Sequence, residues 1–264
     1  MSIICISRGS YYRGKDVAER VASILGYQCV SRDSLLAVSD EFDIPEIKLT
    51  RNIQHATQIL ERYSFGRERY VNFISAEILK RLRMDDHVYH GLAGQFFVNN
   101  ISHLLRIRII ADLDDRVKAE AERENISEDK ARMQLKHDDE QRQKWALFLY
   151  GADITDPAQY DLTVNVSALG VEDSAELISQ TAKLPCYLTT EESQGNINDQ
   201  ALAAEIRAAL FDFPLAGVST REGRAYVNVK APEEQADQIR ARIESAVGGI
   251  VDLGMADIRV DPFY

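Results

Sequence analysis

Short apolar runs alternate with amphipathic stretches along the first 184 residues of the chain. The strand-like runs are followed by apolar residues at helical spacing, and they lie at 2–7, 28–33, 88–91, 106–111 and 160–166. Helical patterns lie at 14–25, 45–62, 67–83, 116–150 with a break near 125–127, and 170–183. This alternation predicts an α/β fold, a mainly parallel sheet covered by helices on both faces.

The pattern changes after Pro185. Residues 189–198 are polar and rich in turn formers, which predicts a linker over 185–198. Beyond it, the order of apolar segments predicts a small α+β unit, α-β-β-α-β, over 199–264. That segment holds no histidine and no catalytic cluster, so we expect it to bind a ligand, to form a homodimer or to regulate. The predicted domains are therefore 1–184 and 199–264.

The first apolar run leads into a glycine-bounded loop with the spacing Gly9-x-x-x-x-Gly14-Lys15. This is the spacing of a phosphate-binding loop, whose backbone N–H groups and following helix start face the phosphates. A helix does follow, because Val17 and Val21 open an apolar series that ends at Gly26. The loop predicts a nucleotide phosphate site at Gly9, Ser10, Arg13, Gly14, Lys15 and Asp16.

One position of the loop departs from the motif. Asp16 stands where Ser or Thr ordinarily ligates magnesium. A carboxylate can bind magnesium, but it also places negative charge beside anionic phosphates. Taken alone, the loop favours nucleotide binding no more than an ordinary strand-to-helix turn that contains two glycines.

Composition and charge limit the classes of molecule that the protein is expected to bind. The 264 residues are 45% hydrophobic with a net charge of -11, which argues against a general nucleic-acid binder, though a small basic pocket for a nucleotide remains open. No apolar run reaches membrane-spanning length, and no signal peptide is visible. Three scattered cysteines lack metal-ligand spacing, which is typical of reduced thiols in a cytoplasmic protein.

Later motifs have the order and spacing of a known family. Asp139-x-x-Arg142 precedes the segment 150–157, reading YGADITDP, and the strand-like segment 160–167, reading YDLTVNVS. The stretch 6–8, reading ISR, stands before the loop, and 31–36, reading SRDSLL, follows the second strand. Together these segments resemble the cytidylate kinase-like family of P-loop nucleoside monophosphate kinases over the first 184 residues.

The resemblance implies ATP and Mg²⁺ as cofactors and transfer of the γ-phosphoryl group to a nucleoside monophosphate such as CMP, or to a related small acceptor. It implies catalytic roles for Lys15 and Arg142, a metal contact at Asp16, and acceptor contacts near Arg32 and Asp33. It also implies a lid, the segment between Arg116 and Arg142, whose cations close over the transferring group. The available lid cations are Arg123, Arg132, Lys136 and Arg142. The alternative for these cations is a solvated helix with ordinary salt bridges to neighbouring acids.

Leu92 is a second departure, because the family usually carries an arginine directly after the glycine that corresponds to Gly91. His90 is a candidate to compensate, although a lone histidine at a strand end is more often structural. Three hypotheses follow: an active kinase, a nucleotide sensor or pseudokinase whose output lies in the C-terminal unit, and an oligomeric scaffold with a vestigial loop.

The C-terminal unit weakly resembles a BON domain, a small α/β module associated with binding lipids or other ligands. The resemblance rests on Gly223, Val227 and Val229, the helix from Glu233, and the segment 248–251, reading GGIV. An acidic chain without a basic amphipathic helix argues against a membrane role.

Overall fold

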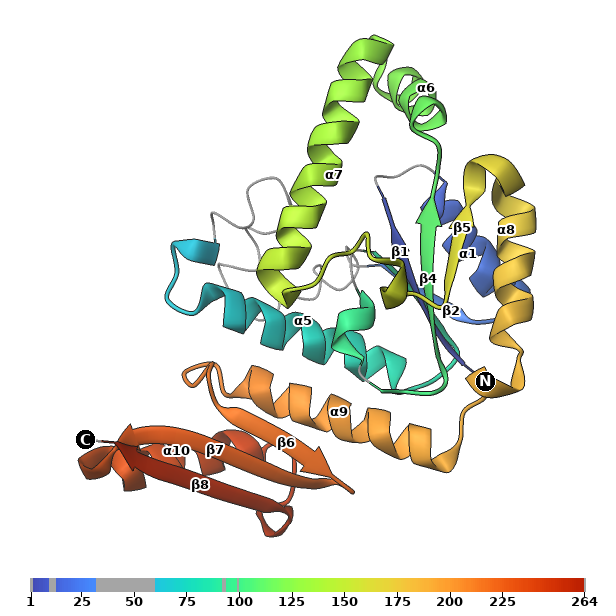
Figure 1. Cartoon of the computed structure of the whole chain (residues 1–264). Coiled ribbons are helices and arrows are strands. Elements are labelled where there is room, and N and C mark those ends of the chain that lie inside the picture. The colour runs from blue at the N-terminus through green and yellow to red at the C-terminus, as the bar shows by residue number, and fades with distance from the viewer. Residues whose placement is uncertain (1, 10–12, 32–59, 92–93, 99, 264) are drawn as a thin grey trace. The chain divides into compact units, whose positions relative to one another are not determined.

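The computed structural model describes residues 2–9, 13–31, 60–91, 94–98 and 100–263 (Figure 1). The predicted site residues Ser10, Arg32 and Asp33 lie outside these ranges, as does most of the helix expected over 45–62. The chain forms two compact units. The first comprises Met1–Ile59 and Met84–Thr189, and the second comprises Leu60–Arg83 and Thr190–Tyr264.

A five-stranded parallel sheet in the order β2-β3-β1-β4-β5 is the frame of the first unit. Its strands are β1 (Ile3–Arg8), β2 (Gln28–Ser31), β3 (His87–Gly91), β4 (Leu104–Ile110) and β5 (Leu162–Asn165). The short 3-10 helix η2 (Gly94–Phe97) follows β3. The predicted α/β fold with a parallel sheet is confirmed, and all five carboxyl ends meet at one edge.

Helices α1 (Gly14–Leu25) and α8 (Val166–Ala182) pack together on the sheet. Their apolar faces meet in one core, where Val17 and Val21 of α1 join Ile178 of α8 against Ile4 and Leu105 of the strands. The core residues are almost fully buried, as parallel strands covered by helices require. This packing fixes the start of α1 directly behind the carboxyl end of β1.

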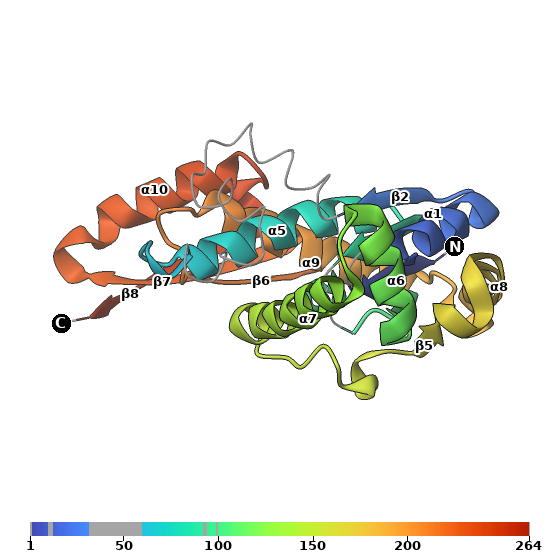
Figure 2. The same cartoon turned by 90° about the horizontal axis from the view of Figure 1, so that it is seen from above.

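The expected long helix over 116–150 is a hairpin of two helices, α6 (Leu113–Glu124) and α7 (Glu128–Tyr150). The break falls where it was predicted, because Asn125 takes a left-handed conformation and the Ser127 side chain accepts from the Lys130 N–H to cap α7. A small core around Val117 and Leu135 holds the two helices side by side (Figure 2). The hairpin starts beyond the carboxyl end of β4.

The second unit has the predicted α-β-β-α-β order. Its elements are α9 (Glu191–Ala209), β6 (Gly217–Arg221), β7 (Arg224–Pro232), α10 (Ala236–Gly248) and β8 (Ala256–Phe263). The central strand β7 pairs antiparallel with β6 and parallel with β8. Alternate β7 residues are buried, and Val227 and Val229 pack on Ile206 of α9 and Ile243 of α10.

The prediction of a linker is wrong for residues 191–198, because these residues form the first turns of α9. The physical reason is a capping box: the Thr190 side chain accepts from the backbone N–H of Ser193, and the Ser193 hydroxyl accepts from the backbone N–H of Thr190. The polar residues that suggested a turn therefore start a helix.

Helix α5 (Gly66–Leu82) belongs to the second unit although it lies in the middle of the chain. The guanidinium carbon of Arg69 lies 4.2 Å from the centre of the Phe211 ring, and Asn72 donates to the carbonyl of Pro214 at 3.4 Å. A helix was predicted here, but a boundary near 185–198 places it in the other domain. The two units thus divide the chain differently from the predicted domains.

Candidate functional site

A cavity of about 390 Å³ lies at the carboxyl ends of β1 and β4, against one side of α7. The carboxyl edge of a parallel sheet is the usual place for a ligand in α/β proteins. Six charged side chains line this cavity: Arg8, Arg108, Arg116, Asp139, Glu140 and Arg142. Four cations face two carboxylates, so the lining favours an anion.

The predicted phosphate loop borders this cavity in part. Gly9 lines it, and Arg13, with φ 45°, immediately precedes the first turn of α1. Lys15 and Asp16 are exposed and are not among the described residues that line the cavity. The Lys15 ammonium lies 3.4 Å from the Glu19 carboxylate, one helical turn along. The strand–loop–helix context that the motif needs is present, while the lysine points its charge at its own helix.

Arg116 and Asp139 form a bidentate ion pair in the cavity wall. Two guanidinium nitrogens of Arg116 donate to the two carboxylate oxygens of Asp139, both at 2.8 Å. The Arg116 side chain is only 13% exposed, whereas Asp139 is 41% exposed. The pair ties the start of α6 to the middle of α7 at the mouth of the hairpin.

Arg108 comes from within strand β4 and reaches the segment before β5. It donates to the Ile154 carbonyl at 2.8 Å, and its guanidinium carbon lies 5.7 Å from the centre of the Tyr160 ring. The Tyr160 hydroxyl donates to the same carbonyl at 2.8 Å. Arg108 is therefore held by a fixed acceptor and an aromatic face at the rear of the cavity.

A side-chain clamp fixes the segment that carries Ile154. Arg106 and Asp161 form a bidentate pair, with nitrogen–oxygen distances of 3.1 and 2.6 Å, and this bond raises the pKa of Arg106. The Asp153 carboxylate accepts from the backbone N–H and the hydroxyl of Thr155, which lowers the pKa of Asp153. Thr155 itself lines the cavity, so the turn presents a hydroxyl there.

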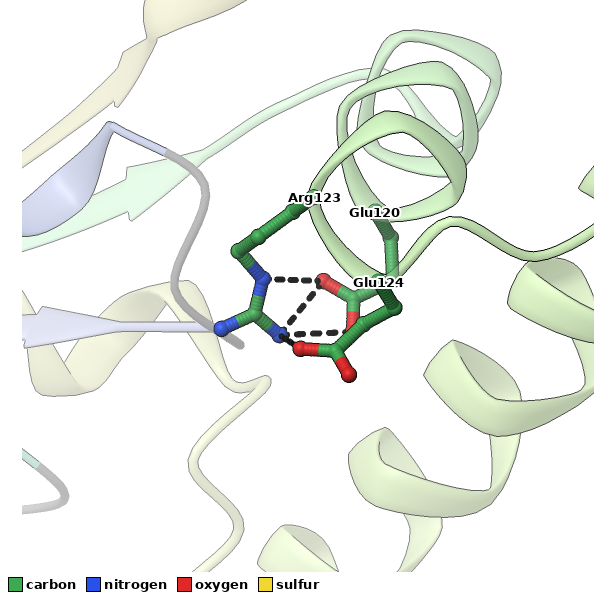
Figure 3. Close-up of polar contacts among 3 residues, drawn as sticks. All are labelled: Glu120, Arg123 and Glu124. Carbon is green, nitrogen blue, oxygen red and sulfur yellow. Dashed lines mark hydrogen bonds and ion pairs between the residues drawn. The ribbon is translucent and has the colours of Figure 1, made fainter.

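The four predicted lid cations lie in different places. Arg142 lines the cavity. Arg123 forms ion pairs with Glu120 at 2.7 Å and Glu124 at 3.3 Å on α6 (Figure 3). Arg132 lies 2.7 Å from the Asp114 carboxylate, and Lys136 is exposed on α7. Within the described structure, only Arg142 of this set reaches the cavity.

The sequence did not single out Arg108 and Arg116 as site residues. Arg108 carried a usable signal, because it is a charged residue inside a mostly apolar strand. Arg116 gave none, since it stands in a helix start where charged residues are common. Its role follows from Asp139, which lies 23 positions further along the chain.

No group of three or more His, Cys, Asp or Glu residues with metal-holding geometry is found in the described part of the chain. Asp16, exposed in the first turn of α1, is a single carboxylate beside the loop. Magnesium usually keeps several waters and binds through one or two carboxylates plus substrate phosphates, and a single carboxylate fits that mode. Likewise, none of the described helices has the length and apolar character needed to cross a membrane.

Comparison with known proteins shows which family the chain belongs to. Residues 3–168 match the model of the cytidylate kinase-like family. A cytidylate kinase of Sulfolobus acidocaldarius is 36% identical over 106 residues, which is 40% of this chain and 58% of that protein. The match therefore spans a little over half the length of this curated relative.

Two solved structures add to the comparison. An uncharacterized protein from Eubacterium ventriosum superposes with a TM-score of 0.54 at 18% identity, over 69% of this chain and 97% of that one, which supports a shared fold. A shikimate kinase from Bacteroides thetaiotaomicron covers 69% of this chain and 99% of its own at 11% identity, with a TM-score of only 0.43.

Proposed function

This protein belongs to the cytidylate kinase-like family, and from that premise we propose that it is a phosphotransferase. It binds ATP and transfers the γ-phosphoryl group to a nucleoside monophosphate such as CMP, or to a related small acceptor. The single observation that carries this proposal is the cavity at the ends of β1 and β4, which is lined by Arg8, Arg108, Arg116 and Arg142. Guanidinium groups are the side chains best suited to bind phosphate oxygens.

In the proposed reaction the acceptor oxygen attacks the γ-phosphorus in line with the bridging oxygen to the β-phosphate. The bond to that bridging oxygen breaks, and ADP leaves with the electron pair. Such a transfer needs positioning and positive charge more than covalent help from the protein. The motif from Gly9 to Lys15 is expected to bind phosphates at the start of α1, and Arg142 and Arg116 supply charge from α7 and α6.

Lys15 has to change partners in this proposal. Its ammonium lies 3.4 Å from Glu19, and both side chains are about half exposed, so the pair holds it weakly. A bound triphosphate offers several negative charges in place of one, and the lysine then turns from Glu19 to the β- and γ-phosphates. When bound, magnesium neutralises phosphate charge, and Asp16 is the residue that would hold it, directly or through water.

A nucleotide sensor with little turnover is the second candidate. Two observations favour it: Asp16 replaces the hydroxyl that ordinarily ligates magnesium, and Lys15 lies outside the cavity lining. In that case ATP binds at the same arginines, and the output passes through the second unit. Binding and turnover therefore have to be measured separately.

The test is ADP release from ATP and magnesium across a panel of nucleoside monophosphates, with ATP binding measured by calorimetry. Lys15→Ala should lower turnover by about 100-fold or more, because the charge on the transferring group loses a partner. Lys183→Ala is the matched control, since this lysine follows α8 and is not a cavity residue. Binding without acceptor-dependent release would favour the sensor, and absence of both would refute the proposal.

A further inference from the structure

Arg8 is the last residue of β1 and the last before the predicted phosphate loop. It lines the cavity together with Gly9, the next residue in the chain. Its strand lies in the middle of the sheet, with β3 on one side and β4 on the other. The guanidinium of Arg8 therefore lies between the start of the predicted loop and the other arginines of the cavity.

His90 holds the guanidinium of Arg8 from the neighbouring strand. The Arg8 Nε donates to the His90 Nδ1 at 3.3 Å, and the histidine is only 3% exposed. The register explains the meeting, because His90 pairs with Ile6 on β1, two residues before Arg8. An Nδ1 that accepts carries no proton, so this bond uses the neutral imidazole with its proton on Nε2.

The aliphatic stem of the same Arg8 side chain passes close to Gly14. A Cβ placed at Gly14 would lie 2.9 Å from the Arg8 Cβ and 3.0 Å from its Cδ. No real side chain makes contacts that short without displacing its neighbour, so the glycine leaves room for the arginine stem to pass the first turn of α1. The second glycine of the motif thus serves the placement of Arg8 as well as the shape of the loop.

The two constraints act on different parts of one side chain. Gly14 leaves room for the aliphatic stem in this conformation, and the bond to His90 orients the guanidinium at Nε. An arginine whose rotamer is fixed beforehand loses less entropy when it binds an anion. This arrangement differs from Lys15, whose ammonium is half exposed and pairs within its own helix.

We infer that Arg8 is a phosphate-binding residue of this site and that His90 is the residue that positions it. The inference rests on the proposed function in that the anion is a phosphate group of the nucleotide or of the acceptor. It assigns His90 a role through Arg8, in place of direct contact with the substrate.

The experiment compares five purified variants of the full chain: Arg8→Ala, Arg8→Lys, His90→Leu, His90→Asn and Arg20→Ala. Arg20 is the matched control, because it is an arginine on α1 that pairs with Glu172 at the surface. ATP and inorganic tripolyphosphate are titrated by calorimetry, and kcat and KM are measured for acceptor-dependent ADP release. Circular dichroism checks that each variant is folded.

Arg8→Ala should weaken binding of both probes, or lower kcat/KM, by about 10- to 100-fold, the usual range for loss of a charged hydrogen bond. Arg20→Ala should stay within about twofold. His90→Leu should reproduce most of the Arg8→Ala loss, while His90→Asn, which places an acceptor oxygen near the former Nδ1, should recover most of the activity. Arg8→Lys should fall between, because an ammonium keeps the charge and loses the planar geometry.

The inference fails if Arg8→Ala behaves like Arg20→Ala. The positioning role of His90 fails if His90→Leu and His90→Asn lose the same amount, which would indicate packing alone. Tripolyphosphate separates these results from the proposed function. Wild-type binding of tripolyphosphate that depends on Arg8, without ATP binding or ADP release, would refute the kinase and keep the inference. A wild-type chain that binds neither probe would refute both.

Discussion

The arginines that line the cavity and those on the outer surface of the α6–α7 hairpin share a residue type but differ in their surroundings. Arg108 and Arg116 are partly buried and bind a fixed carbonyl and a fixed carboxylate at 2.8 Å. Arg123 and Arg132 are on the hairpin surface and pair with carboxylates of α6. Both groups satisfy their charges, yet only the first lines a cavity.

The difference indicates that charge alone does not place an arginine in the cavity wall. In the cavity wall, strand β4 places the guanidinium of Arg108, and the bond to Asp139 places that of Arg116. Partial burial strengthens the electric field of both groups. On the hairpin surface, water screens the pair and both side chains keep much of their freedom. The following three predictions test this contrast, from the largest expected effect to the smallest.

Arg116→Ala should have the largest effect. It removes a cavity cation and leaves the Asp139 carboxylate without its bidentate partner at the mouth of the hairpin. We expect a loss of about 10- to 100-fold in kcat/KM and about 1–3 kcal/mol in the stability of the first unit. Trp145, the one tryptophan and fully buried in α7, reports unfolding there by fluorescence. If both measurements stay near wild type, the cavity arginines are no different from those on the hairpin surface.

His103 extends the comparison of buried and exposed side chains to the pH dependence of stability. It is fully buried just before β4, and burial lowers its pKa from the ordinary 6.5. The unfolded chain therefore binds a proton near pH 6.5 that the folded chain resists, so stability should be complete above that pH and fall as the pH drops below it. His103→Gln should reduce the loss of stability in urea unfolding between pH 7 and pH 5.

His137→Gln is the control for this prediction, because His137 is exposed on α7. It should leave the pH dependence as in the wild type. An equal change in both variants would mean that burial does not distinguish the strand side from the hairpin. All five histidines lie within the ranges of the first unit, so the second unit should show no such acid response.

Arg123→Ala and Arg132→Ala should have the smallest effect. Both lie in surface ion pairs that water screens, and neither lines the cavity. We expect kcat/KM within about twofold of wild type and stability close to that of the wild type, measured at low and at moderate salt. A tenfold loss of kcat/KM in either variant would show that the hairpin closes over the substrate and carries these cations into the site.

Local chemistry made much of the fold predictable. The apolar runs of the strands, the break at 125–127 and the order of the C-terminal unit follow from periodicity and capping, which act over a few residues. The same methods missed the start of α9, because Thr190 and Ser193 read equally as a turn and as a capping box. The choice depends on whether a helix surface is available to pack, and that is a property of distant residues.

The candidate site was less predictable. Arg142, which the resemblance implied as a lid cation, lines the cavity, and so do Arg108 and Arg116, which the sequence did not single out as site residues. Arg116 meets Asp139 because α7 folds back on α6, and Arg8 meets His90 because β1 and β3 are neighbours with a separation of 82 residues. Neither contact can be predicted from the spacing of these residues along the chain.

By itself, the sequence determined the α/β class and the resemblance to a kinase family, and it predicted a phosphate-binding loop, because each depends on residue types at short, fixed intervals. Only the tertiary structure decided which cations share a cavity, that Gly14 makes room for Arg8, and that α5 packs with the second unit. These features depend on which apolar surfaces bury one another, and burial joins residues that the chain keeps far apart.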